Sequence, residues 1–241
     1  EKRVYYPIRE KLSACTDLPI FMEHDADVGA LAYWWFYNEN PAQEVIMNIL
    51  TTDGVGIGLV DSGRIFTGTS SCSCEMGHIT IDYKGRPCTC GSNGCLNAYC
   101  SSGAMEDITR EQLRFHPESS LTKMQAISAQ SVFQAMAQED DFSRNIVIEE
   151  GKYLGHGIIS LLHVFDPDKI VITGTLAQGG ETLLSGIKET MFARRSGYTH
   201  LPQIELFDSS RDLILLGGAA FAMDKILSRP TEFMNLSPTN V

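Results

Sequence analysis

Positive charge and long apolar runs are both scarce in this sequence of 241 residues. Its 19 Lys and Arg residues face 30 Asp and Glu residues, which gives a formal net charge of -11. Binding to a phosphate backbone needs clustered Lys and Arg, so this balance excludes a chain that grips nucleic acid by itself. No apolar stretch is long enough to span a bilayer, and no secretory leader pattern is present. We therefore expect a soluble, cytoplasmic protein with no membrane partner.

The chain also lacks internal repeats and low-complexity segments, while 43% of its residues are hydrophobic. A chain of this length and composition can bury a substantial core, and we expect one large domain over residues 1–241. The sequence begins with Glu1 rather than Met and runs directly into a charged, helix-like stretch, which is typical of part of a longer polypeptide. Residues 229–241 contain Pro230, Pro238 and several polar residues, and this composition predicts a loose tail.

The pattern of apolar residues predicts an α/β fold. LPIFME at 18–23 is a short apolar run and DVGALAYWWF at 27–36 has helical spacing, so a strand should lead into a helix there. Segment 44–66 contains β-branched runs, a glycine-rich turn and the turn sequence DSG, which together predict an antiparallel meander.

The second half of the chain continues this alternation. Polar and helical stretches cover about 101–138, and an apolar-periodic helix is expected over about 142–164. DPDKIVITG at 166–174 and QIELFD at 203–208 then predict strands, and 213–227 predicts a further helix. This helix and strand order is typical of an α/β fold.

The cysteines are unevenly placed, since four of the seven, Cys88, Cys90, Cys95 and Cys100, lie within thirteen positions. A disulfide scaffold suits much shorter secreted chains, so metal binding in a reducing compartment explains them better. Together with His78, the first three form a Cys3His set of the kind that holds zinc in a closed tetrahedral site. Such a site has no open position for water, so the zinc is expected to be structural. A chance grouping of surface thiols is the alternative.

Other Cys and His residues carry weaker signals. Cys72 and Cys74 are interpreted as small buried residues. His156, between two glycines of the expected long helix, is interpreted as a packing residue rather than a ligand.

The strings EMGH at 75–78 and CTCGSNGCLN at 88–97 resemble the signature of the ROK family of repressors, open reading frames and kinases. Three further strings, LPIFMEHDADVGALA, DGVGIGLVDSGRIFTG and DPDKIVITG, resemble other family segments, so that the resemblance covers about residues 10–225. It implies the two-lobed actin-like, ribonuclease H-like ATPase fold with an inserted zinc-binding loop. The Asp-x-Gly-Gly-Thr phosphate loop of the first lobe is missing from the sequence. The resemblance therefore implies that residues 1–241 are the C-terminal, effector-binding and dimerisation lobe.

The resemblance also implies a sugar site at Asp25, Glu75, His78 and Asn97. Carboxylates accept hydrogen bonds from sugar hydroxyls, and a metal-bound imidazole keeps its second nitrogen for orienting a ligand. Asp25 also suits a helix N-cap and Glu75 a solvated turn, and these are the alternatives for the two residues. Asn97 replaces the family's Glu and lacks its charge, which bears on which sugar fits.

Three departures from the kinase pattern favour a regulator. Asp53 brings a carboxylate to the loop where family kinases have Gly-Thr-Gly, and like charges would repel phosphate there. His24 before Asp25 resembles the family's sugar-responsive repressors, such as the N-acetylglucosamine repressor type, and Thr173 occupies a position where the kinases have glycine. Asp25 is the general base of the kinases, so its presence keeps a ROK sugar kinase as the alternative.

The expected function is sugar sensing and dimerisation in a transcriptional regulator of carbohydrate metabolism. The expected partners are a sugar or sugar phosphate effector, a second copy of the chain, and DNA bound only through a helix-turn-helix in an absent N-terminal part. A protein partner in place of the sugar is a third interpretation.

Overall fold

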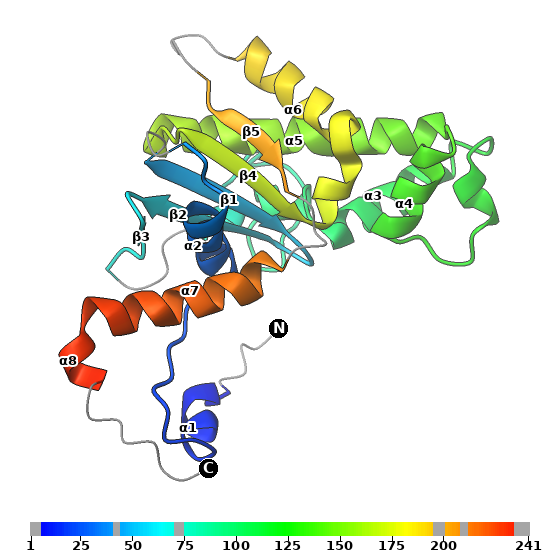
Figure 1. The fold of residues 1–241 in the computed structure, drawn as a ribbon. Coiled ribbons are helices and arrows are strands. Elements are labelled where there is room, and N and C mark those ends of the chain that lie inside the picture. The colour runs from blue at the N-terminus through cyan, green and yellow to red at the C-terminus, as the bar shows by residue number, and fades with distance from the viewer. Residues whose placement is uncertain (1–5, 41–43, 70–74, 195–200, 208–211, 234–241) are drawn as a thin grey trace.

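The computed structural model describes residues 6–40, 44–69, 75–194, 201–207 and 212–233. These residues form a five-stranded mixed sheet with the strand order β3-β2-β1-β4-β5 (Figure 1). The β1, β2 and β3 strands form an antiparallel meander, while β4 runs parallel to β1 and β5 runs parallel to β4. The strands are β1 (Val45–Thr51), β2 (Val55–Asp61), β3 (Arg64–Ile65), β4 (Lys169–Gly174) and β5 (Gln203–Leu206).

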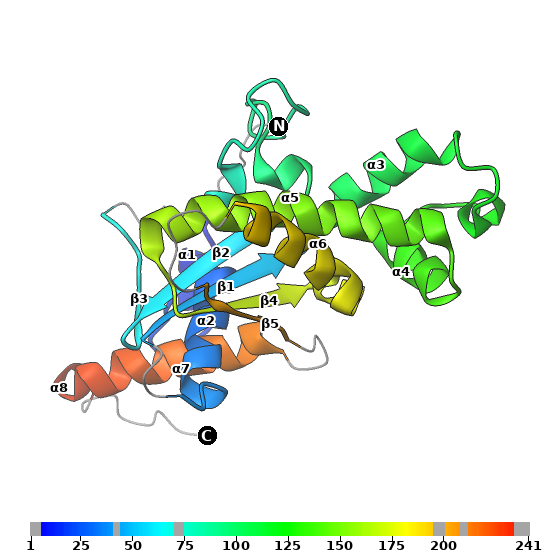
Figure 2. The same ribbon diagram turned by 90° about the horizontal axis from the view of Figure 1, so that it is seen from above.

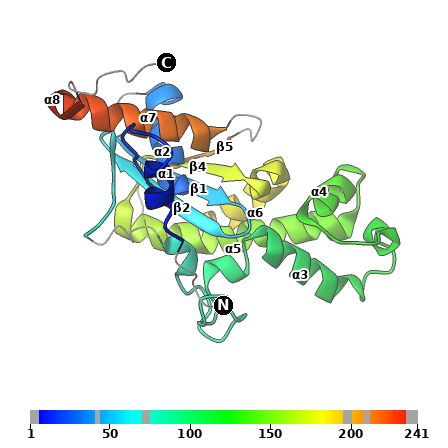
Figure 3. The ribbon, with the colours of Figure 1, turned by 90° about the horizontal axis from the view of Figure 1, so that it is seen from below.

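Helices cover both faces of the sheet. The long helix α5 and its partner α6 lie over one face (Figure 2), and α2 and α7 lie over the other (Figure 3). Helices α3 and α4 extend beyond the sheet beside one end of α5 (Figure 1). The α-helices are α1 (Ile8–Ser13), α2 (Asp25–Phe36), α3 (Ser102–Leu113), α4 (Ala129–Ala137), α5 (Asp141–Phe165), α6 (Gly180–Ala193), α7 (Leu213–Ser228) and α8 (Pro230–Phe233).

Because both faces are covered, the central strands are apolar on both sides. Every β1 residue after Val45 is buried, and so is every β4 residue before Gly174. Helix α2 lies unusually close to β2, since a Cβ atom at Gly58 would stand 2.1 Å from the carbonyl oxygen of Ala26. Only glycine permits this approach, which places the first turn of α2 against the sheet.

A buried amide joins the start of α2 to the two central strands. Asn48 of β1 is 1% exposed, and its Nδ2 donates to the carbonyl oxygen of Ala26 at 3.0 Å. Its Oδ1 accepts from the hydroxyl of Thr173 on β4 at 2.9 Å. The Thr173 hydroxyl also lies 3.5 Å from the carbonyl oxygen of Ile49. These contacts satisfy polar groups that burial would otherwise destabilise.

Most of the expected elements are confirmed. The meander is present, with Ser62 at φ 49° and Gly63 at φ 79° forming its DSG turn. The expected helices at 142–164 and 213–227 are α5 and α7, and the strand at 166–174 is β4.

The strand expected at 18–23 is wrong. These residues are irregular, because no strand among the described residues lies alongside them to complete a ladder, and Leu18 is 70% exposed. Within the expected tail, Pro230–Phe233 forms α8, and residues 234–241 lie outside the described residues. No helix in the described part of the chain has the length and apolar character needed to cross a membrane.

Candidate functional site

A cavity of about 180 Å³ opens where the start of α2 meets the start of β2. The first residues of β2 supply one wall and the first turn of α2 supplies another. Two of the predicted sugar ligands, Asp25 and Glu75, line it from segments fifty residues apart in the sequence. The lining residues are His24, Asp25, Ala26, Asp27, Val55, Gly56, Ile57 and Glu75.

Asp25 is the first residue of α2, and its side chain is exposed at the cavity. His24 rather than Asp25 is the N-cap, so the alternative interpretation of Asp25 as the cap is not what the structure has. The Oδ1 of Asp25 accepts from the backbone amide of Ala26 at 2.8 Å. A carboxylate at this position can accept further hydrogen bonds from a ligand.

Glu75 precedes the short 3-10 helix η1 (Met76–His78), which packs against β2. A Cβ atom at Gly77 would stand 2.1 Å from the carbonyl oxygen of Val55, so glycine is needed for this contact. The close approach places the exposed Glu75 carboxylate beside the cavity and opposite the start of α2.

Asp27 also lines the cavity and was missed by sequence reasoning. It is 2% exposed, and the backbone amide of Leu59 donates to its carboxylate, whose Oδ1 has no hydrogen-bond partner in the described part of the chain. Burial, reinforced by the nearby Glu23 carboxylate, raises the pKa of Asp27 to about 7. The sequence feature that could have indicated Asp27 is an aspartate at the start of an otherwise apolar helical run.

A second group lies directly beside the cavity, where one imidazole and three thiols converge. The ligand atoms of His78, Cys88, Cys90 and Cys95 all lie within 4.8 Å of one another. The Nδ1 of His78 is 3.5 Å from the Sγ of Cys88, and the sulfur atoms of Cys90 and Cys95 are 3.6 Å apart. Zn–S bonds of about 2.3 Å in a tetrahedron would separate two sulfurs by about 3.8 Å. The cluster could therefore hold a metal ion of this size.

The thiols differ in their ionisation. Burial opposes ionisation of Cys88, but hydrogen bonds from the backbone and side chain of Cys90, from Cys95 and from His78 outweigh it and lower the pKa of Cys88 to about 7. Burial, together with hydrogen bonds to Cys90 and Cys88, raises the pKa of Cys95 to about 12. Ionisation of Cys88 is thus favoured, whereas ionisation of Cys95 beside it is opposed. A bound cation would be needed to stabilise several thiolates together.

His78 connects the cluster with the cavity. Its Nδ1 faces the thiols, while its Nε2 lies 4.0 Å from the Oε2 of Glu75. A metal on Nδ1 would leave the Nε2–H group as a donor on the cavity side, beside the Glu75 carboxylate.

Asn97 reaches the cavity indirectly. Its Oδ1 accepts from the backbone amide of Val55 at 2.7 Å, and Asn97 is not among the lining residues. The amide therefore supports the turn between β1 and β2. A direct contact with a sugar stays a prediction.

The remaining predicted residues are also placed. Asp53 is exposed in the turn between β1 and β2, whereas the Thr173 hydroxyl is used inside the core by Asn48. His156 is half-buried and its Nδ1 accepts from Arg194 at 3.0 Å, so it makes a polar contact, and its interpretation as a packing residue stays a prediction. Burial, with the charge of Arg194, lowers the pKa of His156. Cys72 and Cys74 lie outside the described residues.

Comparison with known proteins identifies the family. The ROK family model matches residues 3–225. The chain belongs to the ROK family. As a ROK protein it is 36% identical over 189 residues to the glucokinase of Halalkalibacterium halodurans, and the match covers 76% of this chain and 57% of that protein.

ROK regulators are similar as well. The DNA-binding transcriptional dual regulator NagC of Escherichia coli is 28% identical over 207 residues, covering 85% of this chain and 50% of NagC. Among solved structures, the ROK hexokinase from Thermus thermophilus is similar with a TM-score of 0.78 and 26% identity, covering 92% of this chain and 71% of that one. This ROK chain thus has the mixed sheet of the actin-like sugar kinase fold and spans about half to three-fifths of those two curated relatives.

Proposed function

We propose that this chain is the sugar-sensing and dimerisation part of a ROK-type transcriptional regulator of carbohydrate metabolism. The observation that carries the proposal is the cavity at the start of α2, where the carboxylates of Asp25 and Glu75 line one small polar space. Two acceptors that line the same cavity suit a ligand with several adjacent hydroxyl groups. A sugar or sugar phosphate is the effector class with that pattern.

Three features support a regulator over a kinase. Asp53 adds a negative charge to the exposed turn where a phosphate would lie, which weakens phosphate binding. The His24–Asp25 pair resembles the repressors of the family. Thr173 stands where the family's kinases have glycine, and its hydroxyl donates to Asn48 inside the core. The alternative is a ROK sugar kinase with Asp25 as its general base, and the 36% identity to a glucokinase favours it.

The metal cluster supports the cavity in this proposal. Zinc, held by His78, Cys88, Cys90 and Cys95, would fix the loop that precedes Asn97 and orient the Nε2 of His78 toward Glu75. With four protein ligands it would have a structural role. The donor set fits this ion, since thiolate and imidazole ligands suit zinc.

The rest of the proposal concerns a longer protein. The chain is proposed to be the C-terminal lobe, with sugar binding between two lobes changing the spacing of two DNA-binding heads in a dimer. The match to about half of NagC supports this arrangement.

Calorimetry with hexoses, amino sugars and their phosphates tests the sugar site on the protein that contains this chain. Glu75→Ala should weaken binding by about 1.5 to 3 kcal/mol, because a charged hydrogen-bond acceptor is lost. Glu181→Ala, an exposed residue on α6, is the matched control and should bind as the wild type does. Unchanged affinity in Glu75→Ala would exclude Glu75 as a ligand.

A coupled ADP-release assay separates regulator from kinase. With every sugar that binds, the regulator should stay at background. Sugar-dependent turnover of about 1 per second or faster, the ordinary range of kinases, would establish the alternative.

A further inference from the structure

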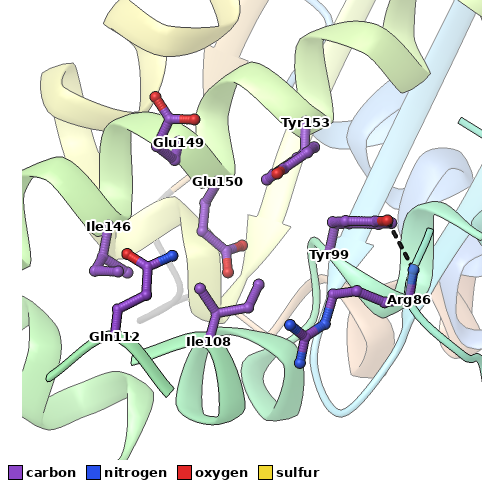
Figure 4. Close-up of a pocket in the computed structure, with 8 residues that line it drawn as sticks. All are labelled: Arg86, Tyr99, Ile108, Gln112, Ile146, Glu149, Glu150 and Tyr153. Atoms are coloured by element: carbon purple, nitrogen blue, oxygen red, sulfur yellow. Dashed lines mark hydrogen bonds between the residues drawn. The ribbon is translucent and has the colours of Figure 1, made fainter. Parts of the chain in front are cut away.

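A second cavity of about 190 Å³ lies between α5, α3 and the loop of residues 78–101 that carries the metal cluster, called the metal loop below. It shares no lining residue with the first cavity. Figure 4 shows its lining side chains, which come from the loop that carries the metal cluster, from α3 and from successive turns of α5. They are Arg86, Tyr99, Ile108, Gln112, Ile146, Glu149, Glu150 and Tyr153.

The carboxylate of Glu150 points into this cavity (Figure 4). Glu150 is 2% exposed, and neither of its carboxylate oxygens has a hydrogen-bond partner among the described residues. Burial alone raises the pKa of this carboxyl well above its ordinary value. A buried carboxyl without a hydrogen-bond partner destabilises the fold, and a group that entered the cavity would supply one.

The charged side chains around Glu150 are already paired with other residues. Arg86 donates to both oxygens of Glu111 at 2.7 and 2.8 Å. Glu149, at the mouth, lies 3.0 Å from the ammonium group of Lys152. Arg86 therefore does not pair with Glu150, which leaves this carboxyl available to a cationic occupant.

The rest of the lining is aromatic and apolar. The rings of Tyr99 and Tyr153 lie 4.5 Å apart and bound one side of the cavity, and Ile108 and Ile146 bound another. Aromatic faces attract cations, and the isoleucines favour an occupant with an apolar body. A bare metal ion would find too few oxygen ligands here, since calcium takes six to eight and magnesium six. The volume is about six times the share of one water molecule in the liquid, which suits a ligand of a few heavy atoms.

We propose that this cavity binds a small primary ammonium compound, whose charged head pairs with Glu150 while its alkyl body contacts Tyr99, Tyr153 and the isoleucines. The occupant would bridge α5, α3 and the metal loop. Tyr99 connects the cavity to that loop, since its hydroxyl accepts from the backbone amide of Arg86 at 2.9 Å. Binding here is thus separate from the sugar cavity and does not depend on the proposed function.

Titration with n-propylammonium, followed by calorimetry and by ligand-observed NMR, tests the proposal on the wild-type protein. Saturable binding is expected, and Glu150→Gln should weaken it by about ten- to a hundredfold, because the isosteric amide cannot ionise to pair with the ammonium group. Glu181→Gln removes a carboxylate that is distant and exposed, and this variant should bind as the wild type does. Glu150→Gln should also raise the melting temperature, which shows that the variant folds and that the carboxylate does not serve the fold.

Three outcomes would overturn the proposal. Equal binding of 1-propanol would show that a neutral hydroxyl compound is accepted. If K⁺ at the same concentration as n-propylammonium displaced it in a saturable way, the cavity would be an inorganic cation site. No response to any of these probes, with Glu150→Gln folded, would mean that water satisfies the carboxyl.

Discussion

Replacing Asp27 with asparagine should stabilise the protein more at high pH than at low pH. The folded chain holds this carboxyl at a pKa of about 7, against 3.8 for an ordinary aspartate. Between those two values the folded state keeps the proton that the unfolded state has lost. Stability contributed by this group is therefore fully present below about pH 4 and falls as pH rises toward 7. The Asp27→Asn variant would carry no such dependence, while the oxygen of its side-chain amide could still accept from the backbone amide of Leu59.

The magnitude follows from the two pKa values. Integrating the proton linkage between pH 5 and pH 8 gives a loss of about 2 to 3 kcal/mol for the wild type that the variant does not suffer. For a domain of this size, that is a difference of about 5 to 10 °C in melting temperature. All other titrating groups are common to both proteins, so they cancel when variant and wild type are compared at each pH.

Urea denaturation of wild type and Asp27→Asn at pH 5 and pH 8 measures the effect. The gain in unfolding free energy from Asp27→Asn should be larger at pH 8. Asp17→Asn, at an exposed loop residue, should show no comparable change between the two pH values. An equal effect of Asp27→Asn at both pH values would show that the carboxyl is ionised in the folded chain and would refute the reasoning.

Two further predictions concern the metal loop and the buried amide. Protein purified without chelator should contain about one zinc per chain by elemental analysis. Cys90→Ser should lower both the zinc content and the melting temperature, whereas Cys15→Ser, at an exposed cysteine, should leave both unchanged. A zinc content near zero in the wild type would contradict the metal site. Asn48→Leu should destabilise the fold by about 2 to 4 kcal/mol, because the Ala26 carbonyl loses its donor and the Thr173 hydroxyl keeps only a weaker acceptor. Thr173→Val should lower the unfolding free energy by less than Asn48→Leu does. Equal stabilities of wild type and Asn48→Leu in urea denaturation would contradict the role of Asn48 in joining α2 to the sheet.

The features that could be predicted from the sequence are those set by neighbouring residues. The meander follows from β-branched runs and a two-residue turn, and the structure forms it at Ser62 and Gly63. The clustering of Cys88, Cys90 and Cys95 follows from their spacing, since a short loop with glycines brings them together. His78 could be added because an imidazole completes the Cys3His ligand set that is typical of a zinc site.

The features that could not be predicted depend on which elements meet. The run at 18–23 has strand character, but a strand needs a partner, and a single segment does not say where its partner lies. Glu149 and Glu150 are identical neighbours, yet the turn of α5 leaves the first exposed and buries the second. Asn48 and Thr173 are 125 positions apart, and their hydrogen bond exists only because β1 and β4 are adjacent.

The turn between β1 and β2 is contacted at three points by residues that lie just before, within and just after the metal loop. Gly77 lies against Val55, Asn97 accepts from the amide of Val55, and Ser102 donates to the carbonyl oxygen of Thr52 through both its backbone and its hydroxyl. A protein engineer who wished to transplant ligand preference between relatives would therefore have to move residues 52–55 and 75–102 as one module. Because the contacted atoms of the turn are backbone atoms, side chains at 52 and 55 can change while positions 77, 97 and 102 continue to set the shape of the turn.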